Sequence, residues 1–147
     1  MTDNSVEIKE YEQVVECIVG SETYALPISW VQEIIQPQPV TPIPRAHPAI
    51  LGLTLVRGKV LPVIDLATVL EGEDRDGKDS RFIVLKIQEE ELIFNVHAVN
   101  GIQQADKIEE PTDLYRERSY VHGVIPKGDR ILLVIDFLKL LDDIRQG

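Results

Sequence analysis

The chain has 147 residues and carries 15 lysines and arginines against 25 aspartates and glutamates, a formal net charge of −10. This balance argues against nucleic acid and anionic membranes as partners, because both require clustered basic side chains. The single cysteine, Cys17, excludes an internal disulfide. The N-terminal segment lacks an apolar secretory signal, and the longest aliphatic run, residues 131–135, is far shorter than a membrane helix of ~20 residues. We therefore expect a cytoplasmic domain that does not insert into a membrane.

The first third of the chain predicts a tail, a hairpin, a short helix and an extended segment. Residues 1–11 are polar and acidic, and we expect a frayed end. Residues 14–19 and 24–28 are β-rich and flank a Gly-Ser-Glu-Thr turn, which predicts a hairpin. A capping-box pattern then predicts a short helix over 30–35. The following segment, 37–48, holds five of the nine prolines and must be extended or turning.

The rest of the chain predicts three more hairpins, a polar loop or linker and a closing helix. In the first of these hairpins, Gly58 at a two-residue loop predicts a type II′ turn, and Pro62 indicates an edge position or a bulge. The polar stretch at 71–80 predicts an exposed loop or linker, and another polar stretch, 106–119, contains one proline and mixed charge. The predicted strand pairs and the helix are 53–57 with 59–65, 82–87 with 92–96, 121–127 with 130–136, and helix 137–144.

An internal repeat gives the strongest indication of architecture. Gly52–Leu70 aligns without a gap on Gly123–Leu141 at an offset of 71 residues (123 − 52), with the tripeptide Val-Ile-Asp and a following apolar helix in both. Residues 14–34 align on 82–102 at an offset of 68. Each half therefore predicts the order strand, strand, short helix, loop, strand, turn, strand, short helix.

Short strands at this spacing favour small closed barrels, since closure removes most exposed strand edges. We expect one domain over residues 12–144, built from two pseudo-repeated barrel halves at about 14–70 and 82–141. The two halves would pack together through their aliphatic faces. The repeat leaves open whether they exchange strands.

The sequence shows no constellation that would carry catalysis or hold a metal or cofactor. The three histidines, His47, His97 and His122, have no partner at metal-ligand spacing, and we expect structural or loop roles for them. Cys17 is expected in the core. Asp65 and Asp136 each stand between a strand and a helix, where an aspartate is a preferred N-cap. We therefore expect no enzymatic activity, no metal and no cofactor.

Two segments carry a family resemblance. The run YALPISWVQEI at 24–34, followed after the prolines by GLTLVRGKVLPVIDL at 52–66, resembles the CheW family of bacterial chemotaxis adaptors, and the resemblance extends over about residues 14–141. It implies a mainly β fold of two small SH3-like five-stranded barrels that share a core, with short helices. It also implies a non-catalytic adaptor that couples the cytoplasmic tips of chemoreceptors to the regulatory domain of the histidine kinase CheA, in cytoplasmic receptor arrays.

The resemblance also implies a receptor-binding surface in the groove between the barrels. Carried onto this chain, it consists of Val31 and Glu33 in the VQEI segment, with Arg57 and Gly58 in the RG turn. An exposed arginine at a hairpin tip can bind a carboxylate or helix-end carbonyls. An intramolecular salt bridge from Arg57 to Glu33 is the open alternative.

Other functions remain open at this stage. The chain also resembles the adaptor half of CheV-like proteins, and an adaptor of a twitching or gliding pathway would carry the same pattern. A hypothesis from a different class is a barrel that binds a small ligand, because small barrels can hold one. Bulky aliphatic residues that would fill the interior speak against it.

Overall fold

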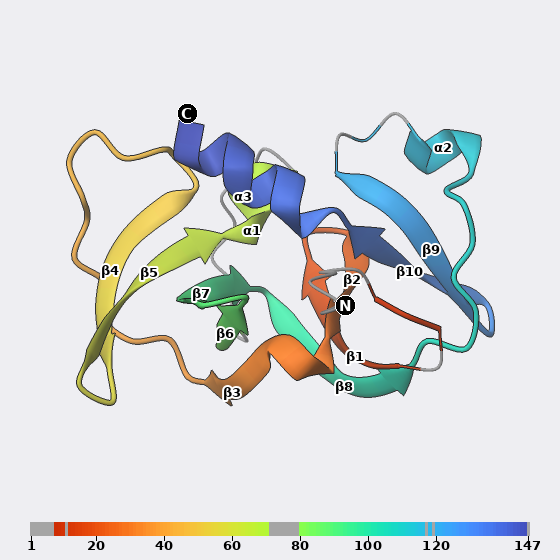
Figure 1. Cartoon of the computed structure of the whole chain (residues 1–147), viewed down its shortest axis with the longest axis horizontal. Coiled ribbons are helices and arrows are strands. Elements are labelled where there is room, and N and C mark those ends of the chain that lie inside the picture. Colours follow the sequence, from red (N-terminus) through yellow and green to blue (C-terminus); the bar gives the residue numbers. More distant parts are fainter. Residues whose placement is uncertain (1–7, 11, 71–79, 117, 119, 147) are drawn as a thin grey trace.

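The computed structural model describes residues 8–10, 12–70, 80–116, 118 and 120–146, and within them the chain forms two five-stranded sheets. We call them sheet A and sheet B; in Figure 1 sheet B lies to the left and sheet A to the right. Sheet A has the order β8 (Ala98–Gln104), β1 (Gln13–Val19), β2 (Glu22–Pro27), β10 (Arg130–Ile135), β9 (Val121–Lys127). Sheet B has the order β3 (Val31–Ile35), β6 (Arg81–Ile87), β7 (Glu90–Val96), β5 (Lys59–Asp65), β4 (Ile50–Val56).

The two sheets follow one plan, with strands exchanged between the sequence halves. The order of the strands in sheet B matches the order in sheet A once each strand is compared with its repeat equivalent. The equivalent pairs are β3 with β8, β6 with β1, β7 with β2, β5 with β10, and β4 with β9. Each sheet thus joins the first hairpin of one half to the last three strands of the other. In both sheets the exchanged hairpin makes the parallel contact, β2 with β10 and β7 with β5. The sheets are therefore not the sequence segments 14–70 and 82–141.

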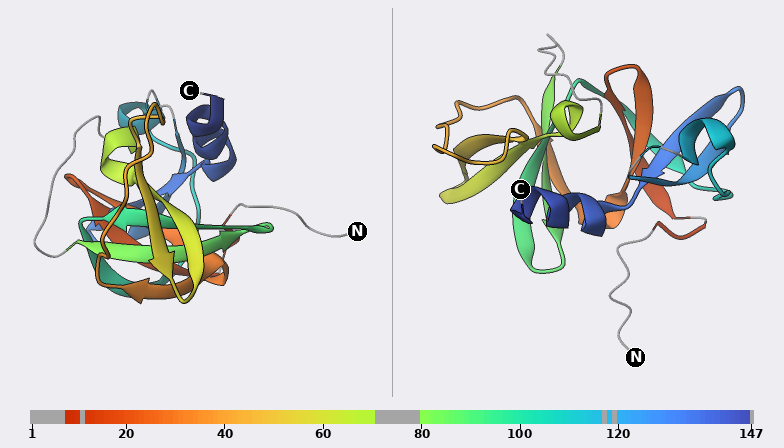
Figure 2. Two further views of the ribbon diagram at one scale, coloured as in Figure 1. Left: turned by 90° about the vertical axis from the view of Figure 1, so that its left-hand side faces the viewer. Right: turned by 90° about the horizontal axis from the view of Figure 1, so that it is seen from above.

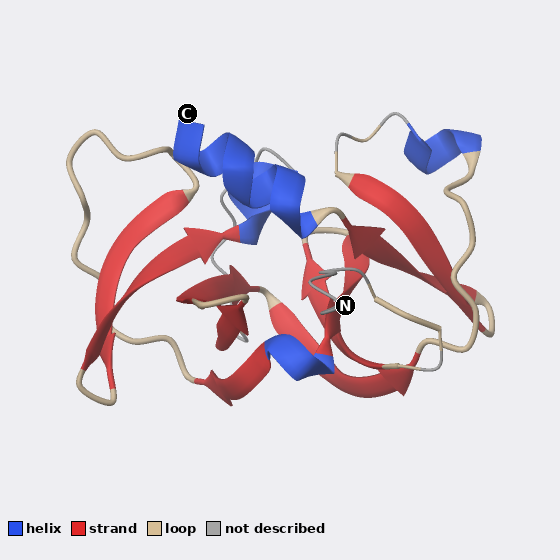
Figure 3. Ribbon diagram, in the orientation of Figure 1, coloured by secondary structure: helices blue, strands red, loops and turns tan. Residues whose placement is uncertain are grey.

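Gly52, one of the glycines in the repeat, lies where the proline-rich segment packs against strand β4. The Thr41 and Leu53 backbones exchange two hydrogen bonds of 2.8 and 2.9 Å, which hold the proline-rich segment against β4. Gly52 beside them has φ +147°, and a Cβ there would lie 2.1 Å from the Thr41 carbonyl oxygen. No other residue fits, because both the backbone angle and the space exclude a side chain. The loop runs along the outer side of sheet B in Figure 3.

Three apolar clusters follow from the alternation of side chains along the strands. One cluster lies inside the sheet A barrel and includes Leu132 and Val134; another lies inside the sheet B barrel and includes Val63 and Ile93. The third and largest cluster is formed by side chains on the opposite faces of these strands, which point away from the barrel interiors. It therefore lies between the two sheets and joins them. Because strand side chains point alternately to opposite faces, the central strands are apolar on both sides. The barrels therefore share a core.

The C-terminal helix closes this shared core. The helix α3 (Phe137–Gln146) follows β10 of sheet A and extends toward sheet B, as the two views in Figure 2 show. Its buried residues lie at helical spacing: Phe137, Leu140, Leu141 and Ile144. The Phe137 ring packs edge-on against Trp30 at 5.0 Å between centroids and stacks on Phe94 of β7 at 5.7 Å. An ion pair between Arg145 and Glu90 ties the last helical turn to sheet B.

The predicted hairpins and the closing helix are confirmed, and α1 (Leu66–Leu70) follows β5 as the repeat predicts. Asp136 caps α3, because its Oδ1 accepts a hydrogen bond of 3.2 Å from the backbone N–H of Lys139. The predicted polar loop at 71–80 lies outside the described residues except for Ser80. The 106–119 stretch contains the short helix α2 (Asp113–Arg116).

The expectations for residues 30–35 and for part of the N-terminal tail are wrong. The predicted helix over 30–35 is a single 3-10 turn, η1 (Ile28–Trp30), followed by strand β3, and its repeat equivalent is strand β8. Pairing with β6 and β1 at the sheet edges outweighs the local capping pattern, and β-branched residues favour the strand. The frayed tail is wrong for Ile8, which is 7% exposed and packs inside the sheet A barrel.

A buried carboxylate lies at the mouth of the sheet A barrel. Glu16 of β1 is 1% exposed, and its Oε2 accepts a 2.9 Å hydrogen bond from Asn100 Nδ2 and another from the guanidinium of Arg130. Its Oε1 has no hydrogen-bond partner among the described residues. The hydrogen bond from Arg130 holds the pKa of Glu16 below its ordinary value, against the opposing effect of burial.

We expect Glu16→Gln to lower the free energy of unfolding at neutral pH by about 1–3 kcal/mol, because a charge-assisted hydrogen bond becomes a neutral one. The folded-state pKa of Glu16 is depressed. The ionised carboxylate therefore contributes stability above its unfolded pKa, and this is lost as the pH falls through the folded value. The difference between the two proteins should shrink below about pH 4.3. Urea unfolding from neutral to acidic pH measures it, and a difference independent of pH would contradict the assignment.

Candidate functional site

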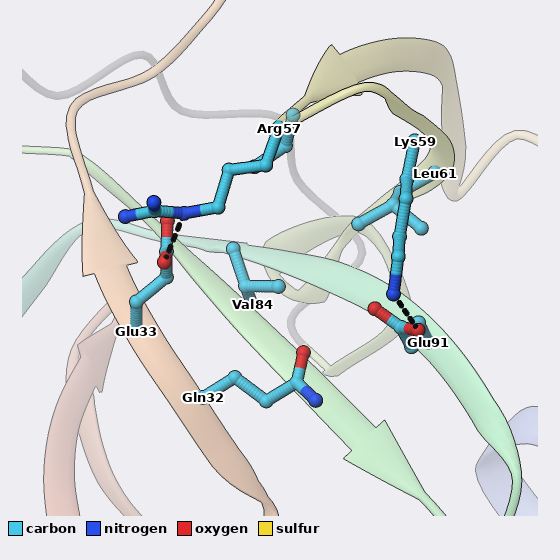
Figure 4. A pocket seen from close by; sticks show the side chains of 8 residues that line it. Gln32, Glu33, Arg57, Lys59, Leu61, Val84 and Glu91 are labelled. Carbon is cyan, nitrogen blue, oxygen red and sulfur yellow. Dashed lines mark hydrogen bonds and ion pairs between the residues drawn. The ribbon is translucent and has the colours of Figure 1, made fainter.

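A small pocket opens at the mouth of the sheet B barrel (Figure 4). Its position follows from strand alternation: the inward-facing residues become polar where the barrel ends, as Lys59 precedes Leu61 and Val63 on one face of β5. The pocket has a volume of about 120 Å³. Its lining residues come from β3, β6, β7 and the β4–β5 hairpin: Gln32, Glu33, Val56, Arg57, Lys59, Leu61, Val84 and Glu91.

Two ion pairs flank this pocket. The Nε of Arg57 donates to Glu33 Oε2 at 2.7 Å, and the Nζ of Lys59 donates to Glu91 Oε1 at 2.7 Å. Both cations belong to the β4–β5 hairpin, and the carboxylates belong to β3 and β7. The Arg57 and Lys59 side chains are 77% and 61% exposed, whereas those of Glu33 and Glu91 are 24% and 23% exposed. The rim therefore presents its cations to solvent and shields its carboxylates.

The hairpin tip holds Arg57 in an unusual conformation. Val56 pairs with Lys59, so the two central turn residues are Arg57 and Gly58, with φ +51° and +80°. Positive φ at both positions defines a type I′ turn, which corrects the predicted type II′ turn. Asparagine is the usual first residue of such a turn, and a left-handed backbone costs an arginine roughly 1–2 kcal/mol. The Arg57 side chain thus stands at the pocket at some conformational cost.

The structure brings two of the four residues expected at the binding surface to the pocket. Glu33 and Arg57 line the pocket and form an ion pair. Gly58 follows Arg57 in the hairpin turn and Val31 packs against the shared core, and neither is part of the lining. Every lining residue belongs to sheet B or its hairpin, so the pocket is the mouth of one barrel and does not lie between the two. The intramolecular Arg57–Glu33 salt bridge, the open alternative, is present in the structure.

Sequence reasoning missed Lys59 and Glu91 as neighbours of this surface. Lys59 could have been found, because it shares the inward face of β5 with Leu61. Glu91 could not, since the parallel pairing of β5 with β7 brings distant segments together without a local signal.

Two of the three histidines have structural partners. The Nδ1 of His47 accepts a hydrogen bond from the backbone N–H of Ala49 at 3.0 Å, and that of His97 accepts one from Gly20 at 2.8 Å. His122 is exposed on β9.

Among the described residues, no three histidine, cysteine or acidic side chains gather as a metal site would require. No helix in the described part of the chain is long and apolar enough to cross a membrane.

Cys17 and Asp65 are both buried. Burial raises the pKa of the Cys17 thiol to about 12, which keeps it protonated and unreactive at neutral pH. The carboxylate of Asp65 accepts hydrogen bonds from the Thr68 hydroxyl at 2.7 Å and from Asn95 Nδ2 at 3.1 Å, so it ties the start of α1 to β7.

Comparison with known proteins identifies the family. Residues 13–145 match the CheW-like domain. The chain belongs to the CheW-like domain family. It is 30% identical to chemotaxis protein CheW of Treponema pallidum over 89% of this chain and 82% of that protein, and 28% identical to CheW of Helicobacter pylori over 90% and 83%.

The fold agrees with a solved CheW structure. The scaffolding protein TtCheW from Thermoanaerobacter tengcongensis has a TM-score of 0.76 and 29% identity, and the match covers 85% of this chain and 88% of that one. The expected pair of SH3-like five-stranded barrels is thereby confirmed. The chain is a CheW-type scaffold of chemotaxis signalling.

We expect Arg57→Asn to leave the free energy of unfolding unchanged or to raise it by up to about 1 kcal/mol. An exposed ion pair contributes only about 0–1 kcal/mol, and asparagine relieves the strained turn. Arg57→Ala, which keeps the strain, should be the less stable of the two. Denaturant unfolding measures both. A loss above about 1.5 kcal/mol in Arg57→Asn would mean that Arg57 braces the barrel.

Proposed function

We propose that the chain couples the cytoplasmic tips of chemoreceptors to the regulatory domain of the histidine kinase CheA, without catalytic activity of its own, in cytoplasmic receptor arrays. Membership of the CheW-like family and the match to a scaffolding protein support this role. A ligand-carrying barrel has less support, because aliphatic and aromatic side chains such as Val63, Phe82 and Ile93 fill the sheet B interior.

The receptor would bind at the β4–β5 hairpin tip. The assignment rests on Arg57, whose backbone is held at φ +51° while its side chain is 77% exposed. Strained backbone positions persist where the surrounding structure fixes them, and they cluster at binding sites. A guanidinium on a chain of net charge −10 offers a defined contact for a carboxylate or a carbonyl oxygen. Glu33 fixes its orientation, Gly58 permits the turn, and Val31 anchors β3 against the core.

The kinase domain would bind the outer face of the same hairpin. Leu55 and Val60 lie directly opposite each other across β4 and β5, and they are 64% and 63% exposed. Exposed cross-strand aliphatic pairs of this kind are typical of the apolar centre of a protein interface. Because they face away from the pocket, the two partners can bind together. A pull-down tests the proposal: an immobilised receptor-tip fragment should capture the CheA regulatory domain only when this chain is present. Binding of one partner that excludes the other would contradict the proposal.

Arg57→Ala should weaken the binding of a receptor-tip fragment about 10–100-fold, because it removes charge-assisted hydrogen bonds from an interface. Binding of the CheA regulatory domain should stay within about twofold. Lys107→Ala is the matched control, since Lys107 is an exposed lysine paired with Glu109 away from the hairpin. Titration calorimetry measures both affinities. Equal receptor binding by Arg57→Ala and the unsubstituted chain would remove Arg57 from the site.

Val60→Ser should weaken CheA regulatory-domain binding about tenfold and leave receptor binding unchanged, because it removes apolar contact area. Ile102→Ser on edge strand β8, where Ile102 is 56% exposed, is the control. The salt dependence should be modest, since charges are depleted at the centre of an interface. A steep loss of affinity between about 50 and 300 mM salt would contradict an apolar contact.

A further inference from the structure

We propose that the pocket between the two ion pairs receives one aliphatic side chain of the receptor tip, flanked by a carboxylate, and that Lys59 and Glu91 are specificity-determining residues of this site. The inference rests on the proposed receptor function and extends it from the hairpin tip to the barrel mouth. The resemblance assigns receptor binding to Val31, Glu33, Arg57 and Gly58, and so to none of the residues Lys59, Glu91, Leu61 and Val84.

The floor of the pocket is apolar. Leu61 and Val84 lie beneath it, 6% and 4% exposed, and Val56 lines its side. Figure 4 shows Val84 between the two ion pairs and Leu61 beside the Lys59 side chain. The volume of about 120 Å³ is enough for one branched aliphatic side chain. Only a few water molecules, at about 30 Å³ each, would occupy that space, and an aliphatic group would displace them from an apolar surface with a gain in free energy.

The rim selects for an acidic neighbour. The two rim cations are far more exposed than the carboxylates with which they pair, so a partner that approaches the rim meets the cationic ends of both ion pairs first. The Arg57–Glu33 hydrogen bond uses Nε, and a guanidinium has further N–H donors for a second carboxylate. Lys59 provides the second positive point on the opposite side of the pocket. A partner carboxylate next to the inserted aliphatic residue would meet one of these cations.

The sheet A barrel provides an internal comparison. Arg130 occupies the position of Lys59 in the repeat, 71 residues later, and likewise precedes inward-facing Leu132 and Val134. There the arginine reaches inward to Glu16, which is buried at the position equivalent to Val84, and Asn100 bonds to the same carboxylate. The sheet A mouth is therefore filled by its own polar side chains. At the sheet B mouth, Val84 leaves the floor apolar and the ion pairs stand at the sides.

Two variants test the pocket separately from the hairpin tip. Val84→Met fills the pocket without adding a charge and should weaken binding of a receptor-tip fragment at least about tenfold. Lys59→Glu reverses the charge of one rim and should weaken it by a similar factor. Lys107→Glu is the charge-matched control and should bind normally. Melting temperatures and binding of the CheA regulatory domain report whether each variant is folded.

Methyl NMR of the full chain gives a readout that does not depend on a substitution. With the receptor-tip fragment bound, the methyl groups of Leu61 and Val84 should shift and show intermolecular contacts to an aliphatic side chain beside an acidic residue. Arg57→Ala could weaken receptor binding while the Leu61 and Val84 methyl signals do not shift and both pocket variants bind the fragment with unchanged affinity. In that case the pocket inference is wrong and the proposed function stands. If the unsubstituted chain binds no receptor fragment, both fail.

Discussion

The rest of the structure depends on the burial of both faces of the central strands. Each sheet turns one face into its own small barrel core and the other into the core that the two sheets share. A strand buried on both sides cannot be separated from either core without exposing aliphatic surface, at roughly 25 cal/mol per Å². The exchanged hairpins increase this dependence, because neither sheet consists of one continuous segment. Phe137, in contact with both Trp30 and Phe94, lies at the centre of the junction. Such a junction would suit the proposed role, in which the chain holds two partners in a fixed geometry.

The duplication also shows how one strand plan produces two different surfaces. In both barrels the inward-facing positions become polar at the mouth, because the strands continue beyond the apolar interior. In sheet A the residues there form a buried network of Glu16, Arg130 and Asn100, which occupies the mouth. In sheet B the charged side chains form two ion pairs at the sides of the mouth, and the floor between them is apolar. The difference between Glu16 and Val84 at equivalent positions accounts for much of this, and it places the candidate site on one barrel only.

Much of the fold could be predicted from the sequence, because its determinants are local. Hairpins follow from β-rich runs on either side of short polar or glycine-containing turns, and Asp136 with the apolar spacing after it predicts α3. The edge strands β3 and β8 were missed, since pairing with β6 and β1 decides their conformation against the local capping pattern. In the site, the Arg57–Glu33 pair was a named alternative, whereas Glu91 depended on a parallel contact between β5 and β7. Long-range pairing is therefore the information that the local pattern lacks.

The central claim is that the shared core makes the two barrels one cooperative unit that presents the site rigidly. Native-state hydrogen exchange tests it most directly, because it gives an opening free energy for each backbone amide. We expect the same maximal opening free energy for β1, β2 and β10 of sheet A as for β6 and β7 of sheet B. If the amides of one sheet exchanged through an opening several kcal/mol less costly than the other, the barrels would unfold independently, and the account would be wrong.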